Sequence, residues 1–166
     1  MGSSSSKRVT ETLQSSADFT TACTTVYQQS LSLTQQAFPG LPRYQIASAS
    51  DRLYQTLTSL NLPLINKWVN SPPTRTQIDK SLKRTVPDGD GVVTVGESEF
   101  KDFAVDLYRD VIVSNAQKAV LVKVPIGVAG IAGIGMFTRS GMEVVGTVIG
   151  VYAVGVATSV YLSFGG

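Results

Sequence analysis

The chain has 166 residues, which suits one compact domain and an appendage, since compact domains centre on about 100 to 150 residues. The formal net charge is only +2, and no stripe of Lys and Arg with interleaved aromatics is present, which argues against a nucleic-acid partner. The chain lacks histidine and has one cysteine, Cys23, which excludes internal disulfides, Cys–His zinc sites and nucleophiles activated by imidazole. The sequence also lacks a phosphate-cradling glycine loop, so we do not expect an enzyme.

The first eight residues are polar and carry a lipidation pattern. A glycine at position two followed by four serines fits N-myristoylation, in which Gly2 becomes the acylated amine. Lys7 and Arg8 would suit an anionic membrane surface. A serine-rich start or part of an expression tag would have the same composition, so these alternatives stay open. We expect residues 1–8 to be disordered.

Apolar residues at helical spacing predict a series of helices in the first half of the chain. The first helix is expected over 9–37, with a break within it left open, and the Pro39–Pro42 segment stops it. Further helices are expected over 43–60, around 64–69 and over 74–85. Trp68 is expected in the core.

The segment from Thr76 to Phe100 has the pattern of a helix, an acidic loop and another helix. Oxygen-bearing residues alternate in this loop, and Ca²⁺ takes about seven oxygen ligands around a sharp glycine turn, with a late glutamate that supplies two of them. The candidate ligands are Asp88, Asp90, Thr94, Glu97 and Glu99. From about Thr74 to Val111 the chain resembles an EF-hand, the helix–loop–helix calcium site.

In a first register of the EF-hand loop, Gly91 makes the sharp turn and Glu97 is the bidentate ligand. The entering helix fits this register. Its weakness is that Val86 stands at the first ligand position and has no side-chain oxygen.

In a second register, Asp88 is the first ligand, Val95 is the central apolar residue and Glu99 is the bidentate ligand. The leaving helix fits this register, but Val93 then stands where glycine is needed. A loop lengthened by two residues reconciles the two registers.

The resemblance implies a partner for this hand. EF-hands usually occur in pairs that share a two-stranded ladder through the central apolar loop residue, and the 92–95 segment has suitable β-propensity. The partner is either a degenerate hand within residues 9–70, for example around the Pro39 turn, or a second molecule. Without metal, Pro87 to Gly91 would simply be a polar turn between two helices.

The leaving helix is expected over 96–118. One face should pack on the N-terminal helices, while acidic residues such as Asp102 and Asp106 should lie largely away from it. The residues expected on the packing face are Phe100, Phe103, Ala104, Leu107, Val111 and Ser114.

Residues 119–166 form a hydrophobic, glycine-rich tail. Val144 to Phe164 is a stretch of about twenty residues without a charge, the length of a membrane-spanning helix. Residues 119–137 would form a second span if Lys123 reaches the headgroups, which predicts a helical hairpin. The glycines, including Gly146 and Gly150, would let two helices approach closely. Buried strands over 144–161 remain the alternative.

The sequence therefore predicts a mainly α protein, with an EF-hand-like domain over residues 9–118 and a transmembrane helical tail. The overall plan resembles small plant calcium-binding EF-hand proteins. We expect a membrane-associated Ca²⁺ sensor or regulator whose N-terminal domain faces the cytosol. Its expected partners are membrane lipid and either another protein or a second copy through the tail. The alternative is a structural or adaptor membrane protein built on a hand that binds no metal.

Overall fold

A computed structural model describes residues 2–34, 38–91, 93–137 and 160–165 of the chain. The described part is mainly helical, as the sequence predicted. The helices of the N-terminal half are α1 (Gly2–Ser15), α2 (Ala17–Leu33), α3 (Ile46–Ser59) and α4 (Pro63–Trp68). They are followed by α5 (Arg75–Thr85) and α6 (Glu97–Phe137). The described residues also contain two short strands, β1 (Leu41–Pro42) and β2 (Thr94–Val95), and two 3₁₀ turns, η1 (Arg43–Gln45) and η2 (Ser163–Gly165).

Two helices, α1 and α2, occupy the segment in which one helix with an open break was expected. The break lies at Ser16, which has extended backbone angles and whose side-chain oxygen accepts a hydrogen bond of 3.2 Å from the Phe19 N–H. The structure also differs from the disorder expected for residues 1–8, because α1 begins at Gly2. Ser5, Val9 and Leu13 recur every four residues and are buried, and α1 packs against α6.

The described residues form two helix–loop–helix units. The first consists of α2, a loop with β1, and α3, and the second consists of α5, a loop with β2, and α6. The two strands pair antiparallel, with Leu41 opposite Val95 and Pro42 opposite Thr94. The sequence left two partners open for a ladder at this position, a segment within residues 9–70 such as the Pro39 turn or a second molecule, and in the structure β1 of the same chain pairs with β2.

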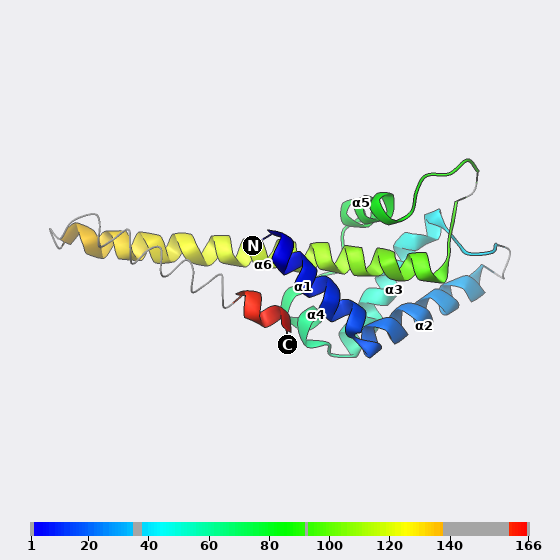
Figure 1. The fold of residues 1–166 in the computed structure, drawn as a ribbon, viewed down its shortest axis with the longest axis horizontal. Coiled ribbons are helices and arrows are strands. Elements are labelled where there is room, and N and C mark those ends of the chain that lie inside the picture. Colours follow the sequence, from blue (N-terminus) through cyan, green and yellow to red (C-terminus); the bar gives the residue numbers. More distant parts are fainter. Residues whose placement is uncertain (1, 35–37, 92, 138–159, 166) are drawn as a thin grey trace.

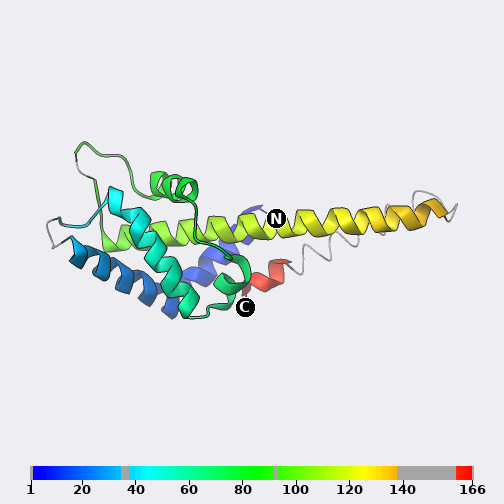
Figure 2. The same ribbon diagram turned by 180° about the vertical axis from the view of Figure 1, so that it is seen from behind.

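Helix α6 is the central element of the fold. It packs against α1, α2, α4 and α5, and its other half extends beyond them (Figures 1 and 2). The expected packing face of its first half is confirmed, because Phe100, Phe103 and Leu107 are fully buried and Ser114 is half-buried. Trp68 is also buried, as predicted.

Two expectations about α6 need correction. The helix continues to Phe137 rather than ending near Lys118, since no glycine or proline interrupts the chain at that point. Asp106 was expected to lie away from the core, but it is only 8% exposed because α5 covers that face of α6.

The C-terminal end of the chain returns to the helical domain. Residues 160–162 are helical, η2 follows, and η2 packs against α1 (Figure 1). Among the residues that the structure describes, no helix has both the length and the apolarity needed to cross a membrane. The expected span over 144–164 lies mostly outside the described residues, as does the expected hairpin connection over 138–143.

Candidate functional site

The candidate metal loop connects α5 to β2 in the second helix–loop–helix unit. Helix α5 leads into this loop. At its N-terminal end, away from the loop, it begins with a capping box, in which the Thr74 hydroxyl accepts a hydrogen bond from the Gln77 N–H and the Gln77 side chain accepts one from the Thr74 N–H. Residues 86–93 follow, and Gly91 has a φ of +105°, in the region that favours glycine. Val95 then enters the ladder opposite Leu41, in the place that the second register gives to the central apolar residue.

Asp88 contacts a residue of the other unit. Its carboxylate forms an ion pair with the Arg43 guanidinium, which comes from the turn after β1. Arg43 is also tied to the second loop through its backbone, because its N–H donates a hydrogen bond of 3.2 Å to the Val93 carbonyl. The Asp88 side chain remains 81% exposed. The Asp88 carboxylate is therefore already paired with a positive charge of the protein itself, the Arg43 guanidinium.

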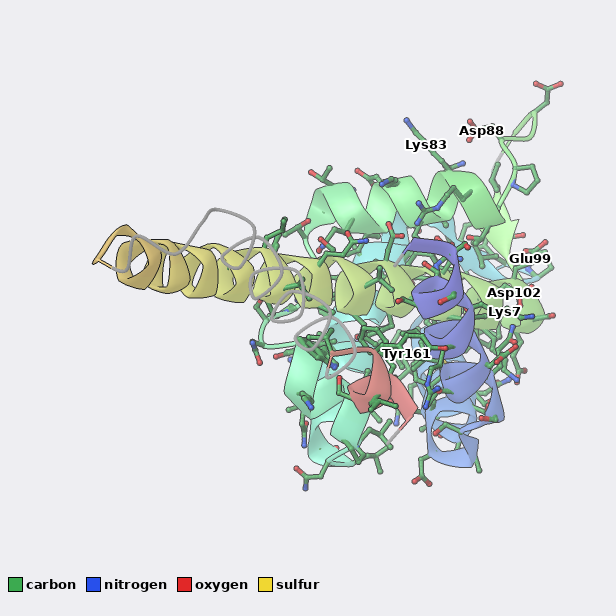
Figure 3. The ribbon with its side chains drawn as sticks, turned by 60° about the vertical axis from the view of Figure 1, so that its left-hand side comes forward. Lys7, Lys83, Asp88, Glu99, Asp102 and Tyr161 are labelled. Carbon is green, nitrogen blue, oxygen red and sulfur yellow. The ribbon has the colours of Figure 1, made fainter. Side chains whose placement is uncertain are left out.

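The two glutamates contact groups of the protein at the start of α6. The Glu99 Oε2 accepts a hydrogen bond of 3.0 Å from the Gly96 N–H, so Glu99 caps the first turn of the helix. The Glu97 Oε2 accepts a hydrogen bond of 3.1 Å from the Gln28 side chain of α2. Figure 3 shows Glu99 beside the start of α6 and Asp88 apart from it on the projecting loop.

The remaining candidate ligands, Asp90 and Thr94, are not grouped with the other carboxylates. Asp90 is exposed on the loop, and Thr94 lies in β2 opposite Pro42. Within the described ranges, no group of three or more Asp, Glu, Cys or His side chains lies close enough to hold a metal ion. The carboxylates as placed do not converge on one point, and a Ca²⁺ site would form only if Asp88 left Arg43 and Glu99 left Gly96.

The loop of the first unit carries no carboxylate at all. Its sequence from Thr34 to Leu41 has glutamine, proline and glycine but neither Asp nor Glu, so it offers no carboxylate ligand for Ca²⁺. A Cβ added at Gly40 would lie 2.6 Å from the Val95 carbonyl oxygen. This glycine is therefore required by the close approach of the two loops.

The contact between Tyr27 and β2 was not predicted from the sequence. The Tyr27 hydroxyl of α2 donates a hydrogen bond of 3.2 Å to the Val95 carbonyl, and both groups are buried. Burial and the nearby carboxylates of Glu97 and Glu99 raise the pKa of Tyr27, which keeps the hydroxyl protonated as a donor. No local signal marks this residue, because its partner lies far along the chain.

An ion-pair cluster joins α5 to α6 on the other side of the second unit. The Arg84 guanidinium donates to Asp106 at 2.6 and 3.0 Å, and the Ser81 hydroxyl donates to the same oxygen at 2.6 Å. Arg84 also contacts Asp110 at 3.0 Å, and Arg109 pairs with Asp106. This cluster fixes α5 against α6, and with it the base of the acidic loop.

Two further residues were singled out from the sequence, Gly2 and Cys23. Gly2, the expected acylation position, is the first residue of α1. Cys23 is a buried free thiol, and burial raises its pKa to about 12, so it is not a nucleophile at neutral pH.

No known protein-family model matches the chain, and no curated protein or solved structure does either.

Proposed function

We propose that this protein is a membrane-associated regulator built on two paired EF-hand-like units, of which the second binds Ca²⁺. The observation that carries the proposal is the pairing of Leu41 with Val95, which joins two helix–loop–helix units through the middle of their loops. One loop is acidic and the other has no acid, so a single Ca²⁺ site per chain is expected.

Binding at this site requires a rearrangement of the loop. Asp88 has to exchange Arg43 for the metal ion, and Glu99 has to exchange the Gly96 N–H. Each exchange gives up a charge-assisted contact, so we expect weak Ca²⁺ affinity. Glu99 caps α6, Phe100 directly follows it in the core and Phe103 lies one turn further, so movement of Glu99 would change the packing of α6.

Membrane association is the second part of the proposal. It is supported by the sequence of the tail, in which about twenty residues from Val144 carry no charge. The Gly2 acylation pattern would add a second, weaker anchor. Flotation of the full chain with lipid vesicles tests the anchor, and the intact mass after expression with an N-myristoyltransferase tests Gly2.

A second candidate function is a structural or adaptor protein that binds no metal. The ion pair between Arg43 and Asp88 favours it, because the guanidinium already neutralises the carboxylate that the second register makes the first ligand. In this case the second loop only connects α5 and α6, and the glycine-rich tail drives assembly.

A Ca²⁺ titration of the full chain in detergent separates the two functions. Calorimetry and amide NMR would follow the wild type, an Asp88→Asn/Glu99→Gln variant and a control Asp102→Asn variant, whose carboxylate lies outside the loop. Saturable binding that shifts the amides of Gly91 and Val95, persists in the control and disappears in the double variant supports a Ca²⁺ regulator. No response at millimolar Ca²⁺ favours the adaptor.

A further inference from the structure

The last described residues of the chain form a set of specific contacts with the helical domain. We call residues 160–165 the C-terminal latch. Its Phe164 is fully buried, and the ring centroid lies 5.8 Å from that of Trp68 in α4. The Thr12 hydroxyl of α1 lies 3.1 Å from the Phe164 carbonyl oxygen and 2.9 Å from the Arg8 carbonyl oxygen of its own helix, and its single hydrogen is shared between these two acceptors. Val160 is also buried.

A charged side chain completes the contact. The Arg8 guanidinium of α1 lies over the Tyr161 ring, 4.8 Å from its centroid, which is the geometry of a cation–π interaction. Figure 3 shows Tyr161 on the short C-terminal helix, on the side of the domain where α1 lies. The latch is therefore attached to the domain by an aromatic contact, a hydrogen bond and a cation–π contact.

The latch overlaps the stretch that the sequence predicts as a membrane span. While Phe164 and Val160 are buried in the helical domain, residues 160–164 are held against it and cannot extend a helix across a bilayer. The rest of the uncharged stretch, 144–159, has about 16 residues, which would be about 24 Å long as a helix. A hydrocarbon core is about 30 Å thick, so the remaining length is too short for a straight span.

We propose that the C-terminal latch controls insertion of the tail into a lipid bilayer, and that its release from α1 and α4 gives the tail the length to cross. The inference rests on the membrane association proposed above. Once released, residues 160–164 would add about 7 Å of helix to the uncharged stretch. Release also frees Arg8 for anionic lipid headgroups.

The test changes the domain side of the latch, so that the tail itself stays the same. An Arg8→Gln/Thr12→Val variant removes the cation–π contact and the hydrogen bond. The matched control is Lys7→Gln/Thr56→Val, because Lys7 is exposed and the Thr56 hydroxyl bonds only to the Arg52 carbonyl of its own helix. A Phe164→Leu variant weakens the latch from the other side while it keeps the tail apolar.

Each full-length protein would be mixed with vesicles of phosphatidylcholine and phosphatidylserine, washed with alkaline carbonate and floated. Trp68 is the single tryptophan of the chain and touches Phe164, so its fluorescence and its quenching by acrylamide report the latch directly. Circular dichroism would show that each variant has kept its helices.

We expect the two latch variants to raise the ratio of inserted to free protein roughly tenfold over the control, and to make Trp68 easier to quench before lipid is added. Equal insertion of latch variants and control would overturn the latch while membrane association stands. Failure of the wild type and every variant to float with vesicles would overturn the membrane proposal, and the latch with it.

Discussion

The hydroxyl of Tyr27 and the carbonyl oxygen of Val95 are joined by a buried hydrogen bond of 3.2 Å. This bond connects α2 of the first helix–loop–helix unit to β2 of the second, directly beneath the strand ladder. The ring of Tyr27 also lies against Phe100 at the start of α6, with centroids 5.8 Å apart. One residue thus supports both the ladder and the first turn of the leaving helix.

Replacing Tyr27 by Phe should lower the free energy of unfolding by about 1 kcal/mol, because the Val95 carbonyl loses a buried donor while the ring contacts remain. Urea denaturation followed by circular dichroism measures the change. Tyr44→Phe is the control, since Tyr44 is 68% exposed and should tolerate the loss of its hydroxyl. Equal stability of Tyr27→Phe and the wild type would contradict this role of the hydroxyl.

Replacing Gly40 by Ala should destabilise the protein by about 1 to 3 kcal/mol, because the new Cβ would lie 2.6 Å from the Val95 oxygen and push the strands apart. Gly89→Ala is the matched control, because its Cβ would meet only the Val93 side chain at 3.8 Å. Thermal unfolding of both variants would test the difference. If both variants had the same thermal unfolding midpoint, the ladder would tolerate a wider spacing between its two strands.

Replacing Asp106 by Asn should cost about 2 kcal/mol, because Arg84 and Arg109 lose the buried carboxylate that they share. The effect should be insensitive to moderate salt, since Asp106 is only 8% exposed. Asp102→Asn on the exposed side of α6 should change stability by less than about 0.5 kcal/mol. If Asp106→Asn lost no more stability than Asp102→Asn, the ion pairs of Asp106 with Arg84 and Arg109 would not be holding α5 against α6.

The buried Cys23 thiol should make stability depend on pH in the alkaline range. Burial raises the pKa of Cys23 from 9.0 to about 12, so its contribution is fully present below pH 9 and is lost as pH rises towards 12. Between pH 8 and pH 10 the wild type should lose roughly 1 kcal/mol more than Cys23→Ala. Urea unfolding at both pH values measures this, and parallel pH dependence of the two proteins would contradict it.

The helices and the core were largely predictable, because their signals are local. The Pro39–Gly40–Leu41–Pro42 segment predicted the end of the first helical region, and Thr74 predicted the start of α5. The apolar spacing of Phe100, Phe103 and Leu107 predicted the buried face of α6. In each case the residues that determine the structure lie within a few positions of one another.

The features that could not be predicted depend on distant residues. Arg43 meets Asp88 only because β1 pairs with β2, and nothing near Arg43 in the sequence indicates an acidic partner. The burial of Asp106 requires Ser81 and Arg84 of α5, so its own helix gave the wrong expectation. The break at Ser16 has neither proline nor glycine, and only its capping side chain marks it.

The strand ladder has a consequence for the way the chain reaches its native state. Leu41 and Val95 are about 54 residues apart, so their pairing closes a long loop, whereas α2 with α3 and α5 with α6 are near neighbours along the chain. We expect each helix pair to assemble first and the ladder to close late in folding. The pairing of the two loops is therefore expected among the last contacts that the folding chain forms.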